Sequence, residues 1–229
     1  MRDDREVWND FDGASDRERV SIAADAYQRY QRSRSPSRDP WVLLDAGPAE
    51  IFILDTRSFR SPNISEDGPE KTMLGTEQKA ALFDWLSRSS APLKIIASPT
   101  PFHRYADTGL DTWAHGFQTE RAEVFRAIDT ADPKNIIIVS GDQHWPAVVE
   151  IELPSGRSIM EFMCTPTAAF TRPAPARETL LEDVLYISEG ERGFGLFEIS
   201  AASGEASYIF RWISEGGETR FSFERSTLG

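Results

Sequence analysis

The chain has 229 residues, and its 40% hydrophobic and 27% charged content is that of a globular protein large enough to bury a core. A formal net charge of −12 argues against a general nucleic-acid or anionic-membrane binder, because phosphate backbones attract Lys and Arg. It does not exclude a phosphate substrate, since a bound metal inverts the local field. The one cysteine, Cys164, excludes an intrachain disulfide and is most simply a small buried hydrophobic side chain. No apolar run is long enough to span a membrane, and the first residues lack the features of a signal peptide.

The N-terminal part of the chain predicts one helix and two strands. Apolar and aromatic residues recur at near-helical spacing within Ser15–Arg34, and Ser15 or Asp16 provides the cap. A loop rich in Ser and Pro follows. Trp41–Asp45 and Glu50–Asp55 then predict two strands around a Gly-Pro turn.

Strands and helices then alternate, which is the pattern of an α/β protein. Two of the three histidines, His103 and His115, fall in one long loop, and long loops in compact domains are often functional. In chain order, the expected elements are a polar loop over 56–69, a helix capped by Thr76 and running through Leu86, a buried strand over Leu93–Ala97, the long loop Ser98–Phe117, a helix over Thr119–Ile128 and a buried strand over Asn135–Val139.

The last third of the chain predicts antiparallel β structure. Ala147–Leu153 and Ser158–Cys164 flank a Pro-Ser-Gly turn, which indicates a hairpin. An irregular loop follows. The remaining strands are expected over Gly193–Ser200, Ala206–Ile213 and Arg220–Glu224.

The segment from Asn135 to Trp145 is the most informative for function. Four β-branched apolar residues run into a glycine and are followed by Asp142 and His144. The run predicts a strand buried on both faces, and the carboxyl end of such a strand is where open α/β sheets bind ligands. Carboxylate and imidazole are metal-ligand types. The alternative is that Asp142 caps the next turn and His144 is a hydrogen-bonded loop residue.

Three polar clusters follow strands or open loops, at 3–6, 55–58 and 141–144. Each has an ordinary structural interpretation as well: the first is a solvated charge run, and Asp55 and Arg57 form a strand-end ion pair. His115 is either a ligand or substrate contact or a loop hydrogen-bonder. His103 is expected at the surface, and Trp145 in the core.

Taken in order, the motifs resemble those of the alkaline phosphatase D-like branch of the calcineurin-like metallophosphoesterases, over nearly the whole chain. A Trp-Asp-Asp-His-Glu motif of that family corresponds here to Arg2-Asp3-Asp4-Arg5-Glu6. The other matching motifs are Asn9-Asp10-Phe11, Asp55-Thr56-Arg57, Leu74 to Gln78 with Trp85-Leu86, Ser98 to Pro101, Asp111 to Arg121 and Gly141 to His144.

The resemblance implies a single domain over 1–229 with part of a four-layer α/β/β/α sandwich, its antiparallel C-terminal strands belonging to the second sheet. It also implies hydrolysis of a small phosphomonoester or phosphodiester by two divalent or trivalent metal ions, with Fe, Ca, Zn and Mn as open candidates. Asp4, Asp142 and His144 correspond to metal ligands. Arg57 is suited to hold a phosphate oxygen, and His115 is the further catalytic candidate.

Two departures from the family pattern bear on activity. The first half of the family's proteins, with its early aspartate motifs, has no counterpart in this sequence. The chain therefore resembles the C-terminal portion of such a protein, and its site is expected to be incomplete. Arg5 replaces the motif histidine, and arginine cannot act as a general acid at neutral pH. We therefore expect poor hydrolysis by the chain alone, and self-association through an exposed edge at Glu50–Asp55 or Leu93–Ala97.

Two other function classes remain open. One is a non-catalytic remnant or binding module that keeps the fold. The other, a metal-independent hydrolase, has no nucleophile motif around Cys164 or Ser140 to support it.

Overall fold

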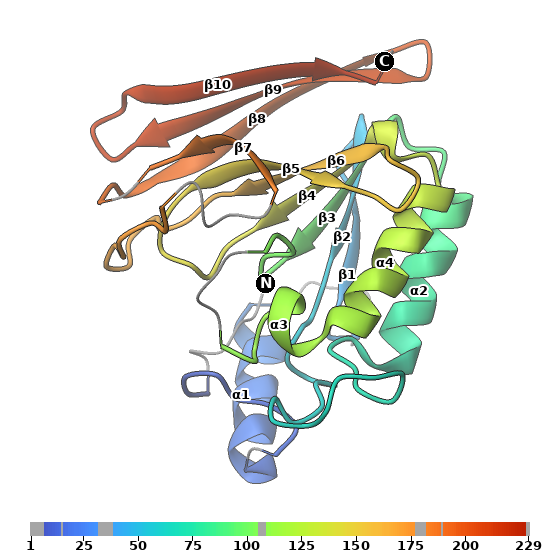
Figure 1. Ribbon diagram of the computed structural model, residues 1–229, viewed down its shortest axis with the longest axis vertical. Helices are drawn as coiled ribbons and strands as arrows, with labels where there is room; N and C mark the ends of the chain where they lie inside the picture. The colour runs from blue at the N-terminus through green and yellow to red at the C-terminus, as the bar shows by residue number, and fades with distance from the viewer. Residues whose placement is uncertain are drawn as a thin grey trace.

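The computed structural model describes residues 7–14, 16–31, 39–104, 109–176, 182–188 and 190–227. Two sheets and one layer of helices make up the fold (Figure 1). The helices are α1 (Arg17–Tyr30), α2 (Gly75–Arg88), α3 (Trp113–Gly116) and α4 (Gln118–Thr130), with a 3₁₀ turn at Pro133–Asn135. The strands are β1 (Val42–Asp45), β2 (Ala49–Ile53), β3 (Leu93–Ser98), β4 (Ile136–Ser140), β5 (Ala147–Glu152), β6 (Ser158–Met163), β7 (Asp183–Ile187), β8 (Gly193–Ala202), β9 (Glu205–Ser214) and β10 (Thr219–Ser226).

The first sheet has seven strands in the order β1-β2-β3-β4-β6-β5-β7. Its four central strands, β2, β3, β4 and β6, run parallel, whereas β1, β5 and β7 are antiparallel to their neighbours. The second sheet is antiparallel in the order β10-β9-β8. This mixed arrangement confirms the predicted α/β class.

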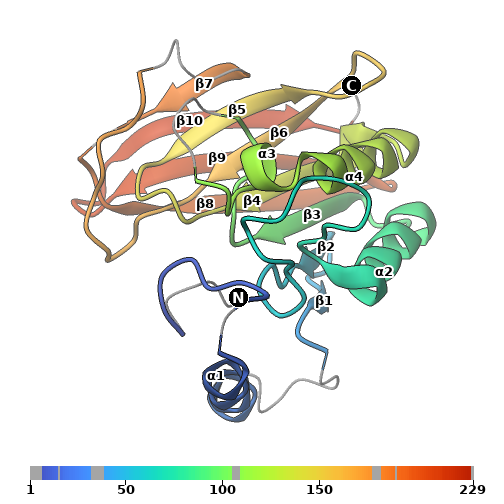
Figure 2. The ribbon, with the colours of Figure 1, turned by 60° about the horizontal axis from the view of Figure 1, so that its bottom comes forward.

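Three layers stack, in the order helix, sheet, sheet (Figure 2). Between α2, α4 and the first sheet lies one core cluster, which includes Leu82, Ile96 and Val124. A second cluster joins the sheets, with Ile137 and Phe162 facing Phe210 and Trp212. Because both faces of the central strands are covered, these strands are continuous apolar runs in the sequence.

Three expectations about the fold are wrong. The β5–β6 hairpin belongs to the first sheet, where β6 pairs in parallel with β4; only β8, β9 and β10 form the second sheet. The two strands proposed as exposed edges, β2 and β3, are each paired on both sides, and the edges are β1 and β7. Self-association through an edge stays a prediction, now for β1, where Leu43 and Leu44 are exposed.

The third concerns the start of α2. Thr76 does not cap it: the helix begins at Gly75, and the Gly75 amide donates to Thr72 Oγ1 at 2.7 Å. The strand β7 was not expected at all. Asp16, in contrast, caps α1 as predicted, accepting a hydrogen bond from the Glu18 amide.

Among the described residues, no helix is both long and apolar enough to cross a membrane.

Gly195 on β8 marks a close approach between the two sheets. A Cβ at this position would lie 2.5 Å from Cys164 Sγ and 2.7 Å from the Phe210 ring. We therefore expect Gly195→Ala to lower the free energy of unfolding by about 1–3 kcal/mol through overpacking. Urea denaturation measures this, with Gly68→Ala as the control, because a Cβ there meets nothing within 4 Å. Equal stability of the two variants would contradict the close packing.

Candidate active site at the carboxyl edge of the first sheet

The four parallel strands end at the same edge of the first sheet, and the segments that follow them carry the polar motifs. Asp55-Thr56-Arg57 follows β2, Thr100–His103 follows β3, and Asp142 to His144 follow β4. The predicted position of Asp142 and His144, at the end of a central strand, is confirmed, since β4 is the fourth of seven strands. This edge is the expected ligand side of an open α/β sheet.

The loop after β4 holds two residues in an unusual backbone conformation. Asp142 has φ +76° and His144 has φ +61°, values that are uncommon outside glycine. Such conformations cluster at functional sites, where the surrounding structure holds them in place. The Asp142 carboxylate accepts a hydrogen bond of 2.8 Å from Gln143 Nε2. Gly141 lies close to Thr165, the residue after the end of β6: an added Cβ would be 3.0 Å from Thr165 Cγ2.

The His144 ring has a defined orientation. Its Nδ1 lies 2.5 Å from the carbonyl oxygen of Phe170, and its ring centroid lies 4.4 Å from that of Phe170. A carbonyl only accepts, so Nδ1 carries the proton and donates. The neutral ring then presents the lone pair of Nε2, which is the arrangement of a metal-ligating histidine. The same contact also fits the alternative interpretation, a hydrogen-bonded loop residue.

Arg57 lies in a buried position beside this edge. Its Nη1 donates to the Phe11 carbonyl at 3.3 Å, and its Nη2 lies 3.7 Å from Asp111 Oδ2. The Asp55 carboxylate accepts hydrogen bonds from the amides of Arg57 and Ser58. The guanidinium therefore links the motif of Arg57 itself to the motifs that contain Phe11 and Asp111.

A pocket of about 470 Å³ opens next to Arg57, between α1 and the segment that follows β2. Its lining residues include Arg57 and Arg60, both almost fully buried, and the aromatic residues Phe11 and Phe59. The other lining residues are Asp12, Gly13, Val20, Ser21, Ala24, Ser58 and Pro62.

His115 lies half-buried in α3. The helix is held tightly, because a Cβ on the next residue, Gly116, would be 1.7 Å from the Leu110 carbonyl oxygen. Neither interpretation of His115 is decided by this placement, and its catalytic role stays a prediction.

The expectation that His103 lies at the surface is wrong, since its side chain is fully buried. Its Nδ1 lies 2.9 Å from Glu161 Oε2, and the Glu161 carboxylate also accepts from the amides of Phe102 and His103 at 2.8 and 2.7 Å. Burial alone would raise the pKa of Glu161. The charge and hydrogen bond of His103, with the further donors, outweigh burial and hold the pKa below its ordinary value of 4.5.

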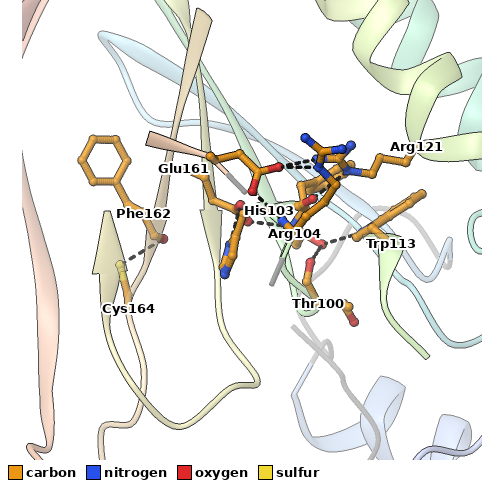
Figure 3. A network of polar contacts seen from close by, with 11 residues as sticks. Thr100, His103, Arg104, Trp113, Arg121, Glu161, Phe162 and Cys164 are labelled. Carbon is orange, nitrogen blue, oxygen red and sulfur yellow. Dashed lines mark hydrogen bonds and ion pairs between the residues drawn. The ribbon is translucent and has the colours of Figure 1, made fainter. Parts of the chain in front are cut away.

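Two arginines extend this network toward the surface (Figure 3). Arg121, from α4, donates through Nε to the Phe102 carbonyl at 2.7 Å and lies 3.2 Å from Glu182. Arg104 pairs with the same glutamate at 3.0 Å. Burial lowers the pKa of Arg121 to about 10, against the opposing charge of Glu182. The segment that follows β3 is thus held by Glu161 on one side and by Arg121 and Glu182 on the other.

The network also contacts the loop that carries His144. Trp145 is buried, as predicted, and its ring meets His103 edge-on with centroids 5.8 Å apart. The sequence contains a signal for this network, because Glu161 is the one charged residue of β6 and has apolar residues on both sides. Cys164 contacts the Phe162 carbonyl through Sγ at 3.5 Å (Figure 3) and is half-buried against the second core, and burial raises the pKa of its thiol to about 12.

The described residues do not by themselves make a metal centre. They contain no group of three or more His, Cys, Asp or Glu side chains placed to hold a metal ion. Asp142 and His144 supply two donors, whereas Asp4 lies outside the described residues. A site for two metals needs more donors than this pair.

Comparisons with known proteins bear on the family. The family model described as PhoD-like phosphatase matches residues 1–201. This chain belongs to the PhoD-like phosphatase family. The alkaline phosphatase D of Bacillus subtilis (strain 168) is 25% identical over 206 residues, which cover 76% of this chain and 35% of that protein. The predicted family is confirmed.

A solved structure, titled "Structure of PhoD", has the same fold. The TM-score is 0.73 at 20% sequence identity, and the match covers 99% of this chain and 51% of the solved chain. The PhoD-like chain therefore spans about a third of the curated relative and about half of the solved structure.

Proposed function

We propose that this PhoD-like chain takes part in the hydrolysis of a small phosphomonoester or phosphodiester at the carboxyl edge of its first sheet. The observation that carries the proposal is the loop after β4, which holds Asp142 and His144 in left-handed conformations with the His144 Nε2 lone pair presented. Membership of the phosphatase family supports the reaction class.

Each residue has a distinct role in this proposal. His144 Nε2 accepts a proton or a metal ion, and the hydrogen bond from Nδ1 to Phe170 fixes the ring for that task. Asp142 contributes a carboxylate from the same loop, and the Arg57 guanidinium places a positive charge at the adjacent pocket. We further propose that divalent or trivalent metal ions assist the reaction, with Fe, Ca, Zn and Mn as candidates. Asp142 and His144 alone provide too few ligands for these metal ions. Asp4 is the further ligand that the sequence suggests.

The experiment compares His144→Ala and Asp142→Asn with the unchanged chain. Hydrolysis of p-nitrophenyl phosphate and bis(p-nitrophenyl) phosphate is measured with each of the four metals. We expect slow but metal-dependent turnover, and a fall in kcat/KM of about 100-fold or more in either variant, because lost ligand or proton-transfer groups cost on this order. Glu152→Gln, an exposed change on β5, should leave the rate unchanged.

The second candidate is a phosphate-binding module without catalysis. It is favoured by one observation, that the described residues contain no group of three or more His, Cys, Asp or Glu side chains placed to hold a metal ion. Calorimetry with orthovanadate separates the two. Binding that persists without turnover under every metal would favour the module and contradict hydrolysis. Metal-dependent turnover that His144→Ala leaves intact would also contradict the proposed site.

A further inference from the structure

A second pocket lies at the opposite end of the first sheet from the candidate active site. It occupies about 810 Å³ between the C-terminal ends of α2 and α4, which lie side by side where β3 and β4 begin (Figure 1). Its lining residues are Phe83, Leu86, Ser87, Ser89, Lys94, Glu123, Arg126, Ala127, Thr130, Ala131 and Asp132. The size is in the range of small-molecule sites.

Lys94 supplies a buried cation to this pocket. It is the second residue of β3, its exposed fraction is 4%, and its Nζ makes one hydrogen bond, a long one of 3.5 Å, to the Leu86 carbonyl. Among the residues that the structure describes, no carboxylate lies within 4.0 Å of Nζ. An ammonium has three donors, and leaving two of them buried without acceptors is unfavourable. Burial lowers the pKa of Lys94, against the opposing charges of Glu50 and Asp132.

The nearby carboxylates are engaged elsewhere. Glu50 accepts from Trp85 Nε1 at 2.6 Å and from Ser89 Oγ at 2.7 Å. Glu123 pairs with Lys79 at 2.7 Å. Asp132, at the rim, lies 4.0 Å from Arg157. The acceptors that Lys94 lacks therefore have to come from whatever enters the pocket.

A second cation and an apolar wall complete the lining. Arg126 is exposed at the rim and makes no ion pair within the described part of the chain. Phe83, Leu86 and Ala127 add apolar side chains to the same lining. Water alone could supply acceptors to Lys94, but water makes no favourable contact with the apolar side chains of the lining. A molecule with an anionic head and an apolar body matches both the cation and the apolar lining.

We propose that this pocket binds a small amphiphilic anion, whose oxyanion head contacts Lys94 and whose apolar body lies along Phe83 and Leu86. Carboxylate, phosphate and sulfonate heads share the required chemistry. The site is separate from the phosphoester site and does not depend on the proposed hydrolysis.

The test uses a matched pair of fluorescent probes. 8-Anilinonaphthalene-1-sulfonate carries the anionic head, and N-phenyl-1-naphthylamine has the same rings without it. Both are titrated against the full chain and the variants Lys94→Met, Arg126→Met and Lys134→Met. Displacement by octanoate, by octyl phosphate and by octanol compares the head groups.

We expect Lys94→Met to weaken binding of the sulfonate by about 10-fold or more, since a charge-assisted hydrogen bond is lost. Arg126→Met should weaken it by about 3-fold, because the rim charge is screened by solvent. Lys134→Met, a change of cation outside the lining, should have no effect. Octanoate and octyl phosphate should displace the probe, and their relative strengths report the preferred head. Octanol should not displace it.

A folding control accompanies the titrations, because Lys94→Met replaces a buried, poorly paired cation by an apolar side chain of similar length. We expect its melting temperature to be equal to or above that of the unchanged chain. A second variant, Ala127→Trp, fills the pocket from α4 and should abolish displacement by octanoate.

Three outcomes would overturn the proposal. They are sulfonate binding that Lys94→Met leaves unchanged, equal loss of both probes in that variant, which would indicate an apolar groove without anion selection, and absence of saturable binding at millimolar octanoate.

Discussion

Replacing Glu161 by alanine should lower the free energy of unfolding by about 3–5 kcal/mol, the cost of breaking a buried, charged hydrogen-bond network. The variant leaves the amides of Phe102 and His103 and the His103 Nδ1 without their acceptor in a fully buried position. Each orphaned donor carries a desolvation cost. Urea denaturation followed by circular dichroism measures the effect.

The same carboxylate should make stability depend on pH. Its pKa in the folded protein lies below the ordinary value of 4.5. The folded state therefore holds the proton less tightly than the unfolded state does, and the stabilisation is fully present above about pH 4.5. It is lost as the pH falls from there through the folded pKa. In Glu161→Gln, this component of the acid destabilisation should be absent.

Glu152→Ala is the matched control, since Glu152 is an exposed glutamate on the neighbouring strand β5. We expect a change within about 0.5 kcal/mol. If Glu161→Ala proved as mild as this control, the hydrogen bonds assigned to the carboxylate would be wrong. If Glu161→Gln lost stability at acid pH as steeply as the unchanged chain, other carboxylates would govern the pH dependence.

Replacing Glu120 by alanine should lower the free energy of unfolding by about 2–4 kcal/mol, because this buried side chain of α4 accepts hydrogen bonds from the segment that leads into α2. Its carboxylate accepts from the Met73 amide and from Thr72 Oγ1, each at 2.5 Å, and it lies 3.4 Å from Lys79. Removing Glu120 leaves the Met73 amide buried and unsatisfied.

Glu123 provides the control within the same helix. It lies one turn further along α4 and pairs with the same Lys79 at 2.7 Å, but it is half-buried and its carboxylate accepts no backbone amide of the described residues. Glu123→Ala should cost no more than about 1 kcal/mol, as expected for a partly exposed ion pair. Thermal and urea denaturation of the two variants should therefore separate clearly. Equal losses would mean that Lys79, rather than the amides, accounts for the role of Glu120.

Local patterns in the sequence determined much of the fold. The apolar run before Gly141 predicts a buried strand wherever that strand lies in the sheet, because burial on both faces requires apolar residues at every position. The Pro-Ser-Gly turn predicts the β5–β6 hairpin, and these two strands do pair antiparallel. The positions of Asp142 and His144 at a strand end follow from the same local signals.

The tertiary structure decided which segments become neighbours. The hairpin signal says that β5 and β6 pair, but not that β6 lies between β4 and β5, since that depends on a partner more than 15 residues away in the chain. His103 has no local pattern to indicate burial; it is buried because Glu161, 58 positions away, offers its nitrogen an acceptor. The segment that leads into α2 is likewise held by Glu120, 47 positions after the Met73 amide it accepts from. Periodicity and turn residues act between neighbours along the chain, whereas a buried donor selects its acceptor in space.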